Sequence, residues 1–388
     1  MKINIKRSLK WIGLGLVGLL LGAALVSYIA NRGLPVSSPV VDRLSETEKA
    51  RLLETDHLRK ALGNSVWPGW GDAEIPTVTY NEQNAFCVGI PGPSAGWTFI
   101  SGTHQGGPWE TVPGDSYAGQ AYYRQRLANL KENPQNFIAR VGETWAATMQ
   151  TSEYSEIAFY QGFREQLPPV VREVFPYGLM WQTLNGGGIE GLIGGLAHEA
   201  FHVFQAQSAL ARVQAAENTA HLEGSYPFED SGQNQAWKDE LDLLVSAVRA
   251  GSTQEARVLA QRYLDARQAR RADLSPELTD YERQREWLEG LAKYAELQID
   301  RAAAGSEYQP APEILSVASF HGYDSRLRFF EQQMDEVKRM DTYRGEVRFY
   351  YSGFAQAVLL DRLMPGWKAR AMDGGVFLDA LLAEAVNQ

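Results

Sequence analysis

The chain has 388 residues, of which 44% are hydrophobic and 22% are charged, so it can bury the core of one large globular domain or two smaller ones. Its formal net charge of −10 argues against nucleic-acid binding, because phosphate groups bind to basic surfaces. With one cysteine, it can form neither an intramolecular disulfide nor a metal site built from several thiolates.

An apolar run without any charged residue occupies residues 11–30, near the N-terminus. About 20 apolar residues in a helix match the thickness of the hydrocarbon core of a bilayer. Basic residues lie before the run, so the positive-inside rule places residues 1–10 in the cytoplasm and the bulk of the chain outside it. We therefore expect a single-pass protein of the cell membrane with an uncleaved anchor, and a cleaved signal peptide is the alternative.

The next segment, residues 31–70, begins with a Pro- and Ser-rich linker and continues into a charged helix. Ser45 and Glu48 have the spacing of a capping box that starts this helix, which we expect to lie on the surface close to the membrane. The remaining residues, 71–388, are expected to form one domain.

Short strands are predicted in the first part of this domain, where β-branched and aromatic residues alternate with Gly- and Pro-rich turns. They span residues 75–80, 86–90, 97–100, 137–141 and 144–151. The last two form either a hairpin or two successive strands.

The segment with the clearest chemistry is Gly191–Gln207, which contains an HExxH motif. Its His198 and His202 are four residues apart, so a helix places both imidazoles on one face, where they can share one Zn²⁺. Glu199 follows the first histidine and is placed to act as a general base. The flanking residues are apolar or small and include no proline, which predicts a mostly buried helix.

A catalytic zinc site needs a third protein ligand and an open position for water. Two glutamates further along the chain are candidates: Glu223, soon after the second histidine, and Glu289, much later in the segment WLEGLAKY. A metzincin ligand set is excluded because Gln205 and Ser208 occupy the positions that its longer motif requires. Geometry alone leaves both glutamates open.

The C-terminal half is predicted to be helical from the periodicity of its apolar and charged residues. The predicted helices span residues 236–250, 253–271, 276–303, 324–340 and 349–363. The second of them carries four arginines, which we interpret as a solvated face paired with local acids: Arg262, Arg267, Arg270 and Arg271.

These motifs resemble the gluzincins, the HExxH metallopeptidases whose last zinc ligand is a glutamate on a second helix. The resemblance is closest to the aminopeptidase-like branch, where an EGxAxY motif supplies this ligand and a YxxG motif follows. Here EGLAKY begins at Glu289 and YYSG begins at Tyr350. The resemblance therefore implies that Glu289 binds zinc and that Tyr350 stabilises the oxyanion, with Tyr351 as the alternative. It covers residues 186–365 and implies a thermolysin-like catalytic core.

The chain departs from the family in two places. Thermolysin-like members carry an acid four residues after the ligand glutamate, but here Lys293 occupies that position, so another carboxylate must orient a ligand histidine. The amine-binding GxMEN motif of the aminopeptidase branch has no suitably placed counterpart, so an aminopeptidase specificity is not supported.

The predicted fold class is α+β and mostly α, with a transmembrane helix, a small β-rich N-terminal part and a helical C-terminal half. An edge strand over residues 144–151 is expected beside the zinc helix, where it can hold an extended peptide. The predicted function is a membrane-anchored zinc metallopeptidase that hydrolyses peptide or protein substrates outside the cytoplasm. It holds one Zn²⁺ through His198, His202 and Glu289.

Two other functions use the same residues. One is a non-enzymatic anchored module with a structural or vestigial zinc site, which His221 and Glu223 are the candidates to close with a fourth ligand. The other is a hydrolase of a non-peptide amide.

Overall fold

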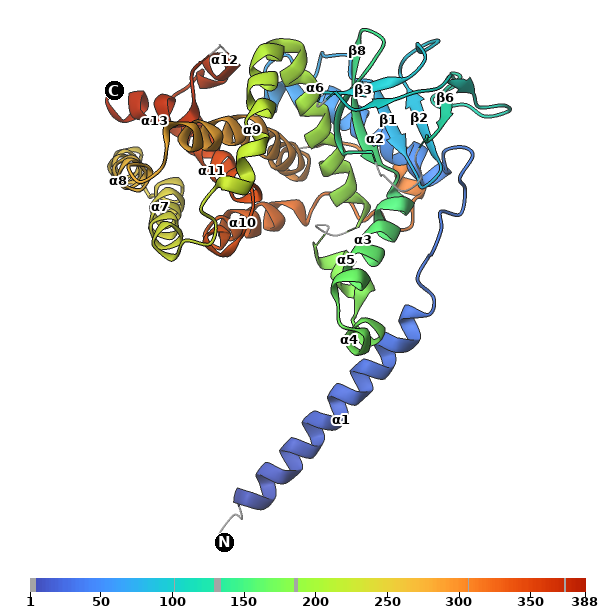
Figure 1. The fold of residues 1–388 in the computed structure, drawn as a ribbon, viewed down its shortest axis with the longest axis horizontal. Coiled ribbons are helices and arrows are strands. Elements are labelled where there is room, and N and C mark those ends of the chain that lie inside the picture. Colours follow the sequence, from blue (N-terminus) through green and yellow to red (C-terminus); the bar gives the residue numbers. More distant parts are fainter. Residues whose placement is uncertain (1–4, 101, 129–133, 185–187, 306, 373–374) are drawn as a thin grey trace.

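The computed structural model describes residues 5–100, 102–128, 134–184, 188–305, 307–372 and 375–388, and the side chains of all of these except 5–14 and 184. The first residues of the predicted tail and the start of the region of family resemblance, at residue 186, therefore lie outside the described residues. The chain forms a helical part, a sheet and an N-terminal helix that projects from both (Figure 1).

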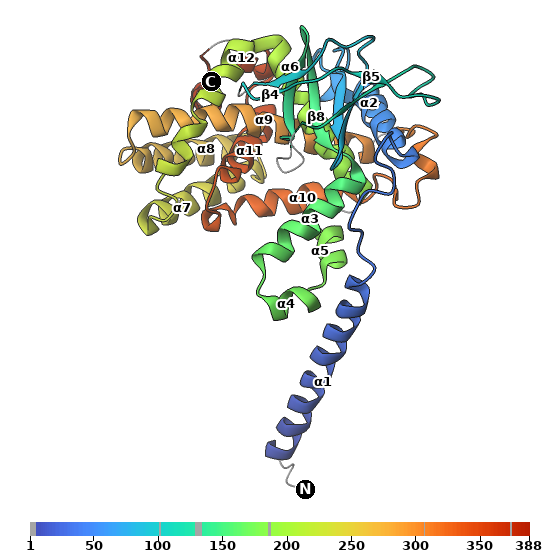
Figure 2. The ribbon, with the colours of Figure 1, turned by 45° about the vertical axis from the view of Figure 1, so that its right-hand side comes forward.

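The projecting helix is α1 (Ile5–Asn31), and its C-terminal end is attached to the body (Figure 2). The side-chain amide of Asn31 donates to the carbonyl oxygens of Glu173, at 3.0 Å, and Phe175, at 2.9 Å, near α4 (Pro169–Val174).

None of the helices in the described part of the chain combines the length and the apolar content that a bilayer crossing requires. A crossing needs about 20 apolar residues in one helix. The prediction of a transmembrane helix over residues 11–30, and with it of a single-pass membrane protein, is therefore wrong.

The sheet has eight strands in the order β4-β3-β7-β8-β1-β2-β6-β5 and is curled rather than flat. All neighbouring strands are antiparallel except β1 and β8, which are parallel. The strands are β1 (Thr77–Tyr80), β2 (Asn84–Val88), β3 (Trp97–Phe99), β4 (His104–Gln105), β5 (Glu110–Thr111), β6 (Tyr123–Arg126), β7 (Phe137–Val141) and β8 (Thr144–Gln150).

Strand β8 lies inside the sheet, so the predicted edge strand is wrong. It pairs with β7 on one side, where Thr144 is opposite Val141, and with β1 on the other, where Gln150 is opposite Tyr80. The strand is therefore flanked on both sides, with β1 paired along residues 147–150, and it does not form an edge of the sheet to which a peptide strand could be added. The fold-class prediction also expected only a small β-rich part, whereas the strands form one eight-stranded sheet.

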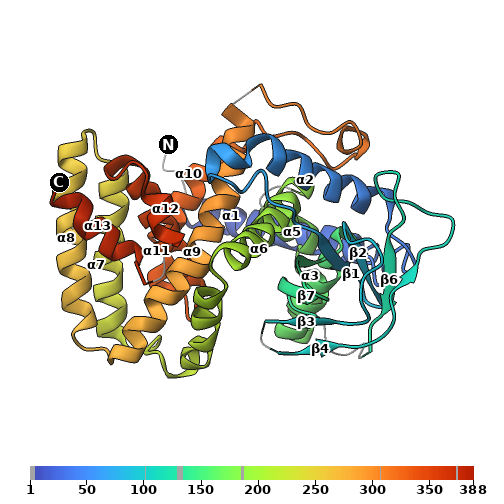
Figure 3. The same cartoon turned by 90° about the horizontal axis from the view of Figure 1, so that it is seen from above.

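Thirteen α-helices lie in the described part of the chain, and two of them, α6 and α9, run between the sheet and the outer helices (Figure 3). After α1 and α4 they are α2 (Glu46–Val66), α3 (Ser152–Gln166), α5 (Tyr177–Leu184), α6 (Ile189–Asn218), α7 (Ser231–Val248), α8 (Thr253–Arg271), α9 (Pro276–Gly305), α10 (Arg326–Val337), α11 (Val347–Leu363), α12 (Trp367–Met372) and α13 (Leu378–Val386). Short 3₁₀ turns are η1 (Ala220–Ser225), η2 (Ile314–Ser316) and η3 (Met340–Thr342).

Helix α2 is buried against α6 and α9, although its charged sequence suggested a surface helix. Ser45 caps it as predicted, because its hydroxyl accepts a hydrogen bond from the backbone N–H of Glu48 at 3.0 Å. The carboxylate of Glu48 in turn binds the guanidinium of Arg51 at 2.6 Å, and both side chains are fully buried. Arg51 also donates to the carbonyl oxygen of Leu192 at 3.2 Å, which ties α2 to α6.

Glu54, further along α2, is a second buried carboxylate. It accepts hydrogen bonds from the hydroxyls of Tyr308, at 3.0 Å, and Tyr323, at 2.8 Å. A third bond comes from the backbone N–H of Ala311 at 2.7 Å. Burial raises the pKa of Glu54, while these three donors oppose that rise.

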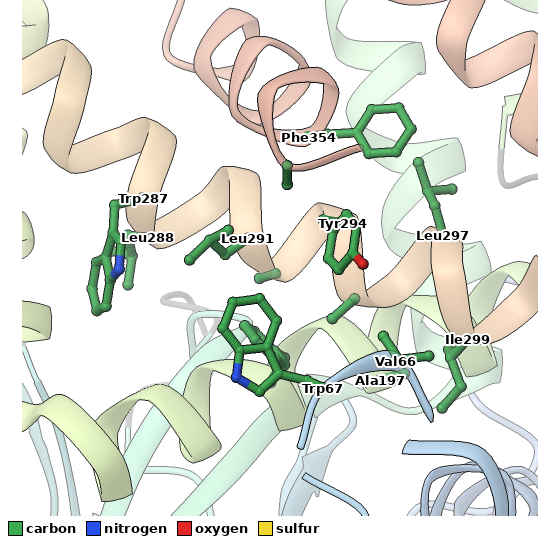
Figure 4. Close-up of a cluster of buried hydrophobic side chains, with 14 of the residues drawn as sticks. Val66, Trp67, Ala197, Trp287, Leu288, Leu291, Tyr294, Leu297, Ile299 and Phe354 are labelled. Atoms are coloured by element: carbon green, nitrogen blue, oxygen red, sulfur yellow. The ribbon is translucent and has the colours of Figure 1, made fainter. Parts of the chain in front are cut away.

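The main core lies where α2, α6, α9 and α11 meet. Figure 4 shows Trp67, just after α2, on one side of α9 and Phe354 of α11 on the opposite side. The Trp67 ring makes edge contacts with Phe201 of α6, at a centroid distance of 5.1 Å, and with Tyr294 of α9, at 6.3 Å. This packing fixes α6 and α9 relative to one another, and these helices carry the HExxH and EGLAKY motifs.

Three of the four arginines of α8 are buried rather than solvated, whereas Arg262 is exposed as interpreted from the sequence. Arg267 and Arg270 are only 2% and 3% exposed. Glu240 of α7 accepts from both, at 2.5 Å and 2.7 Å, and Glu282 of α9 accepts from Arg270 at 2.6 Å. The acids that pair with them come from neighbouring helices, which the sequence of α8 does not reveal.

Candidate metal centre

The two histidines of the HExxH motif lie on one face of α6, as the helical spacing requires. Their Nε2 atoms are 3.1 Å apart, and His198 and His202 are 8% and 1% exposed. The helix has a kink at Ala209, which lies after the motif and leaves the histidine pair on regular helix.

Glu289 brings the third donor from α9. Its Oε2 atom lies 3.3 Å from Nε2 of His198 and 3.2 Å from Nε2 of His202, and the residue is 5% exposed. Among the described residues, this is the one group of three His, Cys, Asp or Glu side chains placed to hold a metal ion. The structure therefore brings together the three predicted ligands.

The alternative ligands lie elsewhere. Glu223, in η1, accepts a hydrogen bond from the backbone N–H of Glu346 at 3.1 Å. It lines the cavity that contains the three donors but does not belong to the group that could hold a metal. His221 is exposed, and its Nδ1 is 2.8 Å from the carbonyl oxygen of Asn218. Neither of them is a fourth ligand in this arrangement.

The distances among the three donor atoms can be compared with what Zn²⁺ requires. Zinc binds imidazole nitrogen and carboxylate oxygen at about 2.0–2.2 Å in tetrahedral geometry, which separates two such ligand atoms by about 3.3 Å. The three separations here are 3.1, 3.2 and 3.3 Å. Two nitrogens and one carboxylate oxygen also form the donor set of many catalytic zinc sites. The residues present therefore fit Zn²⁺.

A carboxylate on α9 orients the first histidine. Nδ1 of His198 lies 3.2 Å from Oε2 of Glu296, so that a proton on Nδ1 is shared with Glu296 and the lone pair of Nε2 faces the other donors. Lys293 binds the other oxygen of Glu296 at 2.6 Å. The sequence showed only that Lys293 had replaced the usual acid. The signal for Glu296 was its spacing, two helical turns after Glu289 on the same face.

Replacing Glu296 by glutamine should weaken zinc binding by about 10-fold or more, because partners of ligand histidines typically contribute 10–100-fold in metal affinity. The dissociation constant, measured by competition with a chromophoric chelator, checks this result. Glu277→Gln, an exposed position in the first turn of the same helix, is the matched control and should leave the affinity unchanged. Equal affinities in the two variants would show that Glu296 does not support the site.

Glu199 and Tyr350 lie at the same centre. Oε2 of Glu199 is buried and has no hydrogen-bond partner among the described residues. Burial raises the pKa of Glu199 to about 7, although the two neighbouring histidines oppose the rise.

The ring of Tyr350 stacks on that of His198 with ring centroids 6.0 Å apart. The Tyr350 hydroxyl donates a hydrogen bond to Glu346 at a long distance of 3.4 Å. The alternative, Tyr351, donates instead to Gln333 at 2.8 Å.

Two glycines allow α9 and α11 to cross closely at this point. A Cβ atom added to Gly290 would lie 2.5 Å from the Cα of Gly353, and one added to Gly353 would lie 2.7 Å from the Cα of Gly290. Gly290 follows Glu289, and Gly353 is three residues after Tyr350. The glycines of the EGLAKY and YYSG motifs therefore place the carboxylate and the phenol beside one another.

The three candidate ligands, Glu199 and Tyr350 line one cavity of about 460 Å³. Arg285 lies in its wall and joins Glu217, at 2.7 Å, to Glu346, at 2.8 Å. Phe137 of β7 packs against the ring of His202 with a centroid distance of 4.7 Å. Sequence reasoning missed Arg285 and Phe137, since neither belongs to a motif.

Comparison with models of protein families, with curated proteins and with solved structures gave no match. The resemblance to the gluzincins therefore stays a prediction that depends on the three motifs. The geometry of the site is an observation that does not depend on this resemblance.

Proposed function

We propose that the protein is a zinc-dependent hydrolase of peptide bonds. The observation that carries this proposal is the convergence of His198, His202 and Glu289, with donor atoms 3.1–3.3 Å apart, in the wall of a cavity that also contains Glu199. Three ligands in an accessible cavity leave a coordination position for substrate, which distinguishes a catalytic site from a structural one.

When bound, Zn²⁺ would polarise the scissile carbonyl group and make water more acidic. Glu199 accepts a proton from the attacking water and passes it to the leaving amine. Its orphaned Oε2 and its raised pKa suit both transfers, since the group is neither paired with a cation nor strongly acidic.

Tyr350 donates a hydrogen bond from its hydroxyl group to the carbonyl oxygen as that atom gains negative charge. Burial raises the pKa of Tyr350, and the nearby carboxylate of Glu289 adds to the rise, so the phenol stays protonated and remains a donor. Its 3.4 Å bond to Glu346 is long for a hydroxyl donor and is easily exchanged for a bond to substrate.

A structural zinc site is the competing function. Such a site is closed by a fourth protein ligand, whereas the group among the described residues has three members.

A hydrolase of a non-peptide amide would use the same three ligands and the same base, so a panel of substrates separates it from a peptidase.

Removal and return of the metal test the proposal. The purified protein should contain about one zinc per chain and cleave peptides from a mixed library. A chelator should abolish cleavage and added Zn²⁺ should restore it, while a hydroxamate should inhibit by binding at the open position. Stoichiometric zinc with no cleavage of any peptide and no hydroxamate binding would contradict the proposal and favour a structural site. Cleavage of amides but not of peptides would contradict the assignment of the substrate.

A further inference from the structure

Gln205 connects the two helices that carry the metal ligands. It is fully buried and follows His202 by three residues on α6. Its Oε1 atom lies 2.8 Å from Nδ1 of His202. Its Nε2 atom donates to the carbonyl oxygens of Trp287, at 3.2 Å, and Leu288, at 3.1 Å, on α9.

These contacts determine which way the amide of Gln205 faces. Carbonyl oxygens only accept hydrogen bonds, so the NH₂ group must face Trp287 and Leu288 and the oxygen must face His202. The amide oxygen also only accepts, so the proton of the neutral His202 ring must lie on Nδ1. The lone pair of the ring is then on Nε2, which faces His198 and Glu289.

The two carbonyl groups have a particular position in α9. They belong to the residues immediately before Glu289, and a carbonyl oxygen has a second lone pair beyond the one used in the helix. Gln205 therefore binds the backbone next to one ligand with the same amide that orients another. His202 on α6 and the backbone before Glu289 on α9 are thus held by one buried side chain. A shift of either helix along the other would break at least one of the three hydrogen bonds of Gln205.

We propose that Gln205 is a positioning residue that sets the tautomer of His202 and holds α6 and α9 in the register at which Nε2 of His202 and the carboxylate of Glu289 meet at one metal ion. The inference rests on the zinc site of the proposed function but not on peptide hydrolysis. It applies equally to a structural site.

Two substitutions separate the contributions of Gln205. Gln205→Met keeps the length of the side chain and removes all three hydrogen bonds. Gln205→Glu keeps an acceptor for His202 but loses both donations to α9. Gln207→Met is the matched control, because Gln207 is an exposed residue of the same helix that also donates to a carbonyl oxygen, that of Glu74 at 2.9 Å.

The measurements are the zinc dissociation constant and the ¹⁵N-histidine spectrum of the zinc-loaded full chain, which has six histidines. We expect Gln205→Met to weaken zinc binding 10–100-fold, as for other partners of ligand histidines, with the Gln207→Met control unchanged. The Nδ1–H signal of His202 should be slow to exchange in the wild type and in Gln205→Glu, and should exchange rapidly in Gln205→Met.

Zinc affinity of Gln205→Met within twofold of the wild type would overturn the inference. If that variant does not fold, the wild-type spectrum still decides, because a His202 ring with its proton on Nε2 contradicts the assignment. A wild-type protein that binds zinc and has the protected Nδ1–H signal but cleaves no peptide would overturn the proposed function and leave this inference intact.

Discussion

Replacing Glu199 by glutamine should reduce peptide hydrolysis by roughly 10²- to 10⁴-fold, the contribution expected of a general base. Glutamine has the same shape but cannot accept the proton of the attacking water. Zinc binding should be retained, because Glu199 is not among the three donor atoms that converge. The rate constant for cleavage of a fluorogenic peptide and the zinc content of the same sample check both parts.

Glu190→Gln is a suitable control for this variant. Glu190 is a buried carboxylate of the same helix that does not line the cavity of the metal centre, and its substitution should leave the rate unchanged. Full activity in Glu199→Gln would exclude the proposed mechanism, whereas loss of activity together with zinc would show that Glu199 is needed to build the site rather than to use it.

Replacing Gly353 by alanine should destabilise the protein by about 3 kcal/mol, at the upper end of the range for overpacked cores. The new methyl group would overlap the carbonyl oxygen of Glu286 and the Cα of Gly290. Both are backbone atoms, so no side-chain rotation relieves the overlap and α9 must move away from α11. The displacement separates Tyr350 from Glu289, and hydrolysis should fall as well.

The urea midpoint of unfolding and the rate of peptide hydrolysis report the two effects of this substitution. Gly162→Ala is the control, because a Cβ atom at Gly162 in α3 meets nothing within 4 Å. Alanine there should be neutral or stabilising by up to about 1 kcal/mol. Equal midpoints for the Gly353 and Gly162 variants would show that the helix crossing tolerates separation.

The sequence predicted local features of the centre better than its surroundings. The spacing of His198 and His202 is a property of one helix, so it placed the imidazoles without knowledge of the fold. Glu289 could not be chosen over Glu223 from geometry, because which of them reaches the histidines depends on how α9 packs. That choice came from the local EGLAKY context, and the structure places Glu289 with the histidines.

The incorrect predictions concern contacts between distant segments. Strand β8 is internal because β1, which precedes it by more than 60 residues, takes its free side. The charges of α2 and α8 suggested surface helices, but other elements cover both. Arg51 pairs with Glu48 of its own helix and is buried under α6, where it donates to Leu192, and Arg267 pairs with Glu240 of α7. Patterns within one segment indicate that a charge is present and do not indicate whether an opposite charge covers it.

The buried carboxylate of Glu54 has a consequence for the order in which the protein is made. Its hydrogen-bond partners follow it by 254 to 269 positions, so the ribosome has synthesised most of the chain before any of them emerges. Until then α2 cannot reach its final environment, and its apolar residues remain exposed to other nascent chains. We therefore expect α2 to reach its final packing only late in synthesis, after the segment that contains Tyr308 and Tyr323 has emerged.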